Sequence, residues 1–251
     1  MKVVRLQILS YQPHTGNVQE IDIATGRVSK YKRIGLVGID KLVSFLDEDG
    51  EPHYLTLRRY DDEYRQIKIF NKKFRTQKSF LIKATSPWDV VVGDVHENDG
   101  LEIVVAPKTD SDIIYQTYSM DGQFLDWRGA HSDHRGVSLG ILDASDGGYG
   151  KIFALLELGG FAQVSVFAQD GTQQRHEVPD YAKGGTLAVG DIDADGEGEF
   201  IIGSGVGRQT ALGYYELNGA VKRKFFGYNS DWQGGIRAQI LDYNADGFAD
   251  V

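Results

Sequence analysis

The sequence predicts an all-β protein, a β-propeller of five four-stranded blades. A motif of a Gly-rich start, an apolar strand and an acidic loop recurs five times, at intervals of 48 to 51 residues. Each interval has room for four short strands joined by turn residues such as Asn-Gly and Asp-Gly. No segment carries the apolar stripe of 3.6-residue period that marks an amphipathic helix. Repeats of about 40–50 residues with four strands each are typical of propeller blades.

The repeat is clearest near the end of the chain. GGTLAVGDIDADGEGEFIIGSG begins at Gly184 and GGIRAQILDYNADGFADV begins at Gly234, and weaker copies begin at Gly35, Ser86 and Arg135. We therefore expect residues 1–251 to form a single propeller domain of five repeats of about 49 residues each. The acidic loops fall at 45–53, 94–102, 143–151, 191–199 and 242–250.

Four strands are predicted in the fourth repeat, and its neighbours repeat parts of the pattern. Turn residues at 218–219 separate the last two of these strands, as Asp-Gly does at 170–171 and 121–122. The fourth-repeat strands are Thr186–Ile192, Phe200–Gly203, Thr210–Glu216 and Val221–Tyr228, and the others are 161–168, 173–178, 113–118 and 123–127.

The two ends of the chain complement each other. The last repeat stops at Val251, just after its acidic loop, whereas Lys2–Ser10, Asn17–Ile23 and Val28–Lys32 read as strands outside any other repeat. We expect N- and C-terminal strands to pair in one sheet and close the ring, because closure removes exposed edges. Two alternatives stay open. The five repeats could belong to a ring of six to eight blades, or the open end could pair with another molecule.

Composition excludes several classes of protein. The 251 residues include no Cys, so there is no disulfide framework, thiolate metal site or Cys nucleophile. The formal charge of −9 argues against a general nucleic-acid binder. No apolar run approaches the length of a membrane span. The N-terminus lacks the apolar region of a signal peptide, so the protein is either cytoplasmic or without its leader here.

Two of the acidic loops are predicted calcium sites. Oxygen-bearing side chains stand at loop positions 1, 3, 5 and 9, with Gly at 6, and the carbonyl of position 7 can add an oxygen. Alternate side chains in a tight loop converge, and Ca²⁺ takes six to eight oxygen ligands, whereas Mg²⁺ demands stricter geometry. Strands rather than helices flank these loops, so they are not EF-hands. The candidate ligands are Asp191, Asp193, Asp195, Glu197 and Glu199 in one loop, and Asp242, Asn244, Asp246, Phe248 and Asp250 in the other.

The other three loops depart from this pattern. Loop 94–102 keeps Asp94, Asn98 and Glu102 but has His96 at the third position, and it is a further candidate. Loop 143–151 places Lys151 at the ninth position, and loop 45–53 has no oxygen ligand at the first, so we expect neither to hold an ion. The alternative for all five loops is a solvated turn, since Asp and Gly both favour turns.

The segment FFGYNSDWQGGIRAQILDYNADGFADV resembles the FG-GAP (integrin alpha-chain-like, or VCBS-type) repeat family. It has an aromatic pair, a short linker, Gly-Gly, an apolar strand and a D-x-[DN]-x-D-G-x-x-[DE] loop. The resemblance implies a propeller whose loops bind structural Ca²⁺ through the side chains named above and the position-7 carbonyls. It also implies an extracellular or cell-surface module that mediates adhesion or protein and glycan binding. The family more often has seven blades, so five repeats depart from it.

An enzyme is the rival class. His131, Asp133 and His134 form the best catalytic-looking cluster, but the repeat register places them in a linker between blades, where we expect an exposed loop. No G-x-S-x-G or H-E-x-x-H motif and no helix-borne phosphate loop is present. We therefore expect no enzyme, while a carbohydrate-active enzyme or lectin and a self-assembling surface protein remain alternatives.

Aromatic residues near the blade linkers raise the possibility of sugar binding. Trp127, Tyr181, Tyr228 and Trp232 would either gather on one rim of the propeller or pack between blades, whereas Trp88 is expected in the core. The Lys222–Lys224 run is predicted to lie on the exposed face of an outer strand, where it would deter edge pairing.

Overall fold

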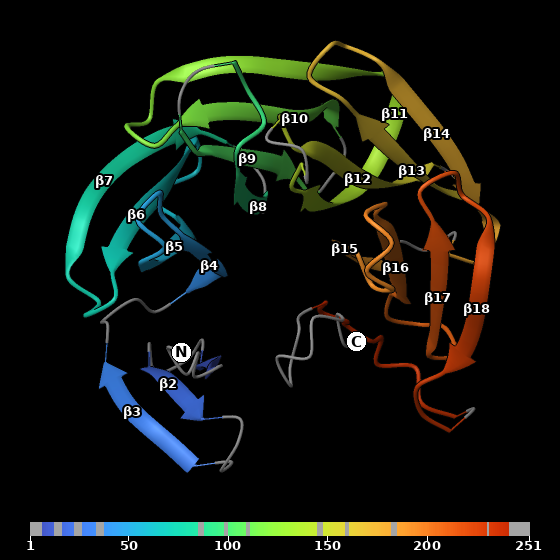
Figure 1. Ribbon diagram of the computed structural model, residues 1–251, viewed down its shortest axis with the longest axis horizontal. Helices are drawn as coiled ribbons and strands as arrows, with labels where there is room; N and C mark the ends of the chain where they lie inside the picture. Colours follow the sequence, from blue (N-terminus) through green and yellow to red (C-terminus); the bar gives the residue numbers. More distant parts are fainter. Residues whose placement is uncertain are drawn as a thin grey trace. The chain divides into compact units, whose positions relative to one another are not determined.

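The structure is a computed structural model that describes residues 7–240 apart from short gaps at 13–16, 23–26, 34–37, 85–87, 98–99, 109–110, 145–147, 159–160, 182–184 and 230. This part of the chain holds 18 strands and one short 3₁₀ helix, Pro179–Tyr181 (Figure 1). No helix in it is long and apolar enough to cross a membrane. By its contacts the chain divides into two compact units, one with β1–β7 and one with β8–β18. The single domain over 1–251 stays a prediction.

The first unit contains two antiparallel sheets in which strands adjacent in sequence are paired. A three-stranded sheet has the order β1-β2-β3, and a four-stranded sheet has the order β4-β5-β6-β7. The strands are β1 (Gln7–Gln12), β2 (Asn17–Asp22), β3 (Arg27–Arg33), β4 (Ile39–Leu46), β5 (Pro52–Arg59), β6 (Tyr64–Asn71) and β7 (Thr76–Lys83).

The second unit begins with a seven-stranded antiparallel sheet of order β14 to β8. Its middle strand β11 is 19 residues long; its first part pairs with β10 and its last part, Arg135–Leu142, with β12. The sheet is thus two four-stranded groups that share β11, and a separate sheet β15–β18 follows. The strands are β8 (Trp88–Gly93), β9 (Glu102–Pro107), β10 (Ser111–Ser119), β11 (Phe124–Leu142), β12 (Lys151–Leu158), β13 (Phe161–Phe167), β14 (Gln173–Val178), β15 (Gly185–Gly190), β16 (Glu199–Ser204), β17 (Ala211–Glu216) and β18 (Val221–Phe226).

The all-β class and the four-stranded repeat are confirmed for β4–β7, β8–β11, β11–β14 and β15–β18. The described residues therefore contain four four-stranded groups, not five. Sheet β1–β3 lies where the terminal strands were predicted, but residues 241–251 lie outside the described part, so ring closure stays a prediction. One prediction is wrong: His131–His134 is not a linker loop, because β11 continues through it.

The segment after β18 lies beside β15 although it is not a strand. The Thr186 hydroxyl donates a hydrogen bond of 2.8 Å to the carbonyl of Ile236, fifty residues further on. A Cβ added at Gly190 would lie 2.7 Å from Cγ2 of Ile240, so the isoleucine packs directly on the glycine backbone. In both contacts the two residues are fifty positions apart, so the start of the fifth repeat packs against the first strand of the fourth.

The first strand of each four-stranded group in the second unit (β8, β11 and β15) carries a short polar side chain that contacts the segment with which the next repeat begins. Asp89, Ser138 and Thr186 share one repeat position, five residues before the first loop aspartate. The amide of Leu139 donates to Asp89 Oδ2 at 3.0 Å, and the amide of Leu187 donates to Ser138 Oγ at 3.2 Å. In the third case the direction is reversed, because the Thr186 hydroxyl donates to the carbonyl of Ile236. Hydrogen bonds from one repeat position, as well as apolar packing, therefore hold neighbouring groups together.

The apolar core of the second unit lies between consecutive sheets. One buried cluster joins β8–β10 to β11–β13, and a second joins β12–β14 to β15–β17. Phe200 at the centre of the second cluster is fully buried and stacks on Tyr215 at 5.1 Å between ring centroids. Trp88 is buried, as predicted.

The same tight turn closes the last hairpin of every four-stranded group. Glycine has a positive φ of 84–85° in three of these turns, as expected of a residue in the left-handed region. In the β6–β7 turn Phe74 takes the glycine position with φ 54°, and its buried ring stacks on Tyr54 at 4.3 Å. Packing of the ring therefore offsets the strain of its backbone.

Replacing Phe74 with glycine tests this balance. The change removes roughly 1–2 kcal/mol of left-handed strain, but loss of a buried aromatic ring costs about 3–5 kcal/mol. We expect a net loss of about 2 kcal/mol in the free energy of unfolding, measured by urea denaturation. Unchanged or raised stability would show that the ring contributes no more than the strain it imposes.

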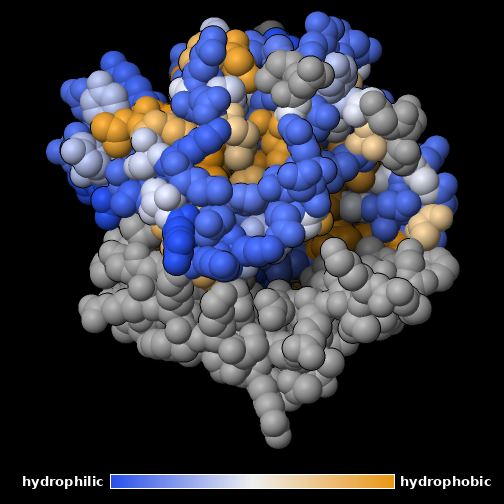
Figure 2. Space-filling model, turned by 60° about the vertical axis from the view of Figure 1, so that its left-hand side comes forward, coloured by the Kyte–Doolittle hydropathy of each residue, from blue (hydrophilic) through white to orange (hydrophobic). Residues whose placement is uncertain are grey.

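The outer strands face solvent. The first four residues of β7 and every residue of β18 are exposed. Figure 2 brings the left-hand side of Figure 1 forward and shows hydrophilic residues over most of the coloured surface, with hydrophobic residues in separate patches. Polar outer strands are the usual protection against edge-to-edge pairing.

Candidate metal centre

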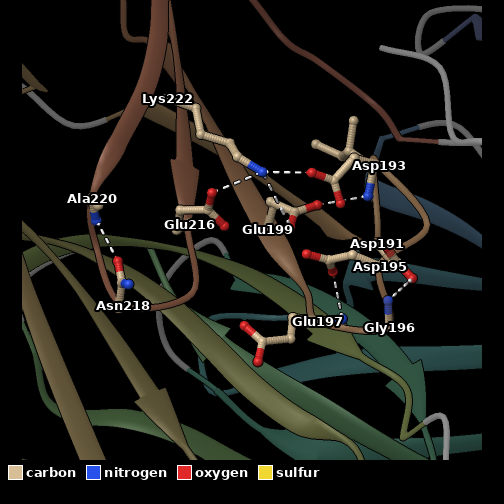
Figure 3. A network of polar contacts seen from close by, with 11 residues as sticks. Asp191, Asp193, Asp195, Gly196, Glu197, Glu199, Glu216, Asn218, Ala220 and Lys222 are labelled. Atoms are coloured by element: carbon tan, nitrogen blue, oxygen red, sulfur yellow. Dashed lines mark hydrogen bonds and ion pairs between the residues drawn. The ribbon is translucent and has the colours of Figure 1, made fainter.

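The loop between β15 and β16 gathers three aspartates. Ala194 and Gly196 have φ of 58° and 87°, and these two left-handed residues turn the chain sharply. Asp191, Asp193 and Asp195 each offer one carboxylate oxygen, and these oxygens lie within 4.8 Å of one another (Figure 3). Among the described residues no other group of three acidic, His or Cys side chains comes this close.

Backbone amides hold the loop but leave carboxylate oxygens available. Asp191 Oδ2 accepts the amide of Gly196 at 3.1 Å, and Asp195 Oδ1 accepts the amide of Glu197 at 2.8 Å. Asp191 Oδ1 is buried and accepts no hydrogen bond. A buried carboxylate oxygen without a partner is costly, and a cation would satisfy it.

Glu199 is the last residue of the loop and the first residue of β16. Its side chain is fully buried, and Oε2 accepts the amide of Ile192 at 2.7 Å. Oε1 accepts no hydrogen bond. Burial raises the pKa of Glu199, the Ile192 hydrogen bond opposes the rise, and the charges of Asp193 and Asp195 add to it. The site thus contains an excess of negative charge in a partly desolvated place.

A lysine from the neighbouring hairpin reaches the same loop. Lys222 Nζ lies 2.6 Å from Asp193 Oδ2, 2.8 Å from Glu216 Oε1 and 4.0 Å from Glu199 Oε1 (Figure 3). The hydrogen bond from Lys222 holds the pKa of Asp193 below its usual range. The sequence placed Lys222 only on an exposed strand face and did not single out Glu216. No local signal joins the two, because β17 and β18 pair Tyr215 with Val221 and Tyr214 with Arg223, and Lys222 falls at the register shift between these pairs.

The residues fit a hard cation. All candidate side-chain ligands are carboxylates, the donors that Ca²⁺ prefers, and two of their buried oxygens lack a hydrogen bond. Asp193 already forms an ion pair with Lys222, so a metal ion would compete with the ammonium for this carboxylate. Of the predicted ligands in this loop, Asp191, Asp193, Asp195 and Glu199 lie together, and Glu197 sits beside them at the turn.

Loop 94–102 repeats part of this architecture. The amide of Val95 donates to Glu102 Oε2 at 2.9 Å, which matches the bond from Ile192 to Glu199 seven residues apart in each case. Asp94 Oδ1 is buried and accepts no hydrogen bond. The predicted ligand Asn98 lies outside the described residues, so this candidate site stays a prediction.

The remaining loops contribute less. Asp47 in loop 45–53 accepts the amides of Asp49 and Glu51 at 3.1 and 2.8 Å and so caps its own turn. In loop 143–151 burial raises the pKa of Asp143, and the nearby charge of Asp94 adds to the rise. The predicted ligands Asp242, Asn244, Asp246, Phe248 and Asp250 lie outside the described residues.

The four aromatic residues near the predicted blade linkers divide between the core and the surface. Tyr181 is buried in the core, which is one of the two arrangements predicted for it, and the 3₁₀ helix turns it toward Tyr215. Trp127, Tyr228 and Trp232 are each at least half exposed. The rings of Tyr228 and Trp232 lie 5.9 Å apart and tilted by 54°.

Comparison with known proteins identifies similar folds but no family. No family model and no curated protein sequence matches the chain. Among solved structures, streptogramin B lyase is similar with a TM-score of 0.56 and 12% identity, over 94% of this chain and 69% of that one. The hydrazine synthase of Kuenenia stuttgartiensis gives 0.56 and 13%, over 84% and 62%. A mutant of the NanB sialidase of Streptococcus pneumoniae gives 0.51 and 8%, over 94% and 42%.

Similarity at such low identity carries information on the fold alone. The three similar structures are named as enzymes, and they are all longer than this chain. Together with the meandering four-stranded antiparallel sheets, the similarities show that the chain has a β-propeller fold.

Proposed function

We propose that the chain is a calcium-stabilised β-propeller recognition module of the FG-GAP (VCBS-type) repeat family. In this proposal five blades close through the N- and C-terminal strands, and the module acts at the cell surface or after secretion. The observation that carries it is the loop 191–199, where three converging aspartates meet the buried carboxylate of Glu199. The proposal assigns no catalytic activity.

Calcium would act as a structural ion. Asp191, Asp193, Asp195 and Glu199, with the carbonyl of Glu197, would hold it, and it would supply positive charge to carboxylates that otherwise repel one another. The loop joins the innermost strand β15 to β16, and Glu199 belongs to β16. Ordering the loop would therefore stabilise the first hairpin of its blade, and the loop at 242–250 would do the same for the fifth repeat.

The proposed location follows from the ion. Loops with four carboxylates and an otherwise exposed turn are suited to the millimolar Ca²⁺ found outside cells, where weak sites are filled. The absence of Cys and the net charge of −9 are compatible with a surface module but do not carry the proposal.

Thermal unfolding with and without Ca²⁺ tests the function. We expect the melting temperature to rise with Ca²⁺ over EDTA and to respond little to Mg²⁺, because a ligand at a hundred times its Kd adds about 2.7 kcal/mol. Asp195→Ala should lose a large part of this rise. Glu197→Ala is the matched control, since it removes a carboxylate from the same loop but keeps the proposed carbonyl ligand. Equal melting in EDTA and Ca²⁺ would overturn the proposal.

Glycan recognition is the ligand class that a specific observation favours. Trp232 is half exposed, yet its backbone is held by a 2.9 Å bond from the Thr210 hydroxyl to its carbonyl. Its indole packs against Gly234, where an added Cβ would be 2.5 Å from Cζ2. A fixed aromatic face beside Tyr228 is suited to stacking on a sugar ring.

A glycan array compares the ligand classes. A saccharide preference that Trp232→Ala removes and Trp127→Ala keeps would support glycan recognition at this pair. Binding of no saccharide by the wild-type chain would leave a protein ligand as the proposal.

A further inference from the structure

We propose that Lys222 is an intramolecular counter-cation of the loop 191–199, and that its ammonium competes with the divalent ion for Asp193. This inference rests on the proposed calcium function and adds a residue that sets the affinity of the site. In the proposal Ca²⁺ binding moves the ammonium off Asp193, and Glu216 keeps it.

Lys222 is held in place although it lies on an exposed strand. All residues of β18 are exposed as whole residues, but only 27% of the Lys222 side chain is exposed, against 46% for Lys224 on the same strand. Its ammonium lies 2.6 Å from Asp193, 2.8 Å from Glu216 and 5.3 Å from the centroid of the Tyr214 ring. These contacts fix the charge over the loop (Figure 3).

The ammonium occupies one of the oxygens that the metal needs. Asp193 Oδ2 accepts the hydrogen bond from Lys222, and the unbonded Glu199 Oε1 lies 4.0 Å from the same nitrogen. A divalent ion among Asp191, Asp193 and Asp195 would lie within a few Å of this positive charge. Repulsion at such a distance is strong in a partly desolvated site, so binding must displace or weaken the ammonium contact.

Glu216 is a second ion-pair partner for the Lys222 ammonium. It lies at the end of β17, across the hairpin from Lys222, and its carboxylate is not among the three that converge in the loop. Rotation of the lysine stem toward Glu216 would free Asp193 without leaving the ammonium unpaired. The pair can therefore exchange between two states without rearrangement of the backbone.

The lysine is specific to this repeat. The hairpin turns align at Phe74, Gly122, Gly171 and Gly219, and three residues later the chain has Gln77, Leu125, Gln174 and Lys222. At the position of Glu216 the other repeats have Asn71, Ser119 and Ala168. Both members of the pair thus occur only in the described repeat whose loop carries the full set of carboxylates. Glutamine at two equivalent positions also shows which substitution the strand accommodates.

The test is calcium titration of the full chain by calorimetry and by thermal unfolding. We expect Lys222→Gln to bind Ca²⁺ about tenfold more tightly at this loop at low salt, and to melt lower than wild type in EDTA. Lys224→Gln is the matched control, because Lys224 lies on the same strand but pairs with Asp180, and its Ca²⁺ affinity should match wild type. The gain should disappear in the Lys222→Gln, Asp195→Ala double variant, which separates this loop from other sites.

The outcomes separate the two proposals. Equal Ca²⁺ binding by wild type and Lys222→Gln would overturn the counter-cation and leave the calcium function intact. Binding by Lys222→Gln alone would support the counter-cation and overturn calcium as the resident ion of the native loop. No calcium response in either chain would overturn both.

Discussion

Replacing Phe200 with alanine is expected to lower the free energy of unfolding by about 4 kcal/mol. The side chain is fully buried and packs between the rings of Tyr215, at 5.1 Å, and Phe153, at 6.1 Å. Truncation of a buried Phe loses its transfer free energy and leaves a cavity between two sheets that cannot close fully. Aromatic contacts add to the loss. Guanidinium denaturation in EDTA measures it without any contribution from metal.

Phe226→Ala is the control for this experiment. Phe226 is 66% exposed on β18 of the same sheet, so its truncation should change stability by no more than about 0.5 kcal/mol. Phe200 also follows Glu199 directly, and we expect the Phe200→Ala chain to lose part of its Ca²⁺ response. A loss below about 2 kcal/mol would contradict the packing of this core.

We expect Asp89→Ala to lower the free energy of unfolding by about 3 kcal/mol. Asp89 is 3% exposed, and its two carboxylate oxygens accept the amides of Val90 and Leu139, each at 3.0 Å. The substitution removes a charged acceptor and leaves a buried amide of β11 unsatisfied, and both effects are costly. Because Leu139 belongs to the next four-stranded group, the loss falls on the contact between groups.

Urea denaturation of Asp89→Ala and Asp89→Asn separates charge from hydrogen bonding. The asparagine keeps an acceptor and should recover about half of the loss. Asp126→Ala is the control, since Asp126 is 38% exposed and only forms a surface ion pair with Arg128. Equal stability of the Asp89 and Asp126 variants would show that the bond between innermost strands contributes nothing.

The strands were predictable because the repeat gives the same information several times. Gln173–Val178 matches its predicted bounds, and most other strands differ by one to three residues at their ends. The pattern of the acidic loop also identified four residues that the structure gathers, because alternate side chains in a tight turn must converge. Local chemistry was sufficient in both cases.

What the sequence did not reveal depends on contacts between distant residues. Polar residues at 131–134 read as a loop, because nothing local shows that a strand can pass from one sheet to the next. The sequence left open whether Tyr181 lies on a rim or in the core, since burial by a 3₁₀ helix has no periodic signal. Lys222 was interpreted as a charged residue that prevents edge-to-edge strand pairing. Its side chain instead reaches the carboxylate of Asp193, 29 residues earlier in the chain.

The shared strand β11 has a consequence for how the molecule comes apart. One backbone supplies the last strand of the group that starts at β8 and the first strand of the group that ends at β14. Opening either group exposes unpaired backbone on a strand that the other group still needs. The two groups should therefore open as one cooperative unit, with similar amide exchange rates on both sides of β11, whereas β15–β18 can open separately.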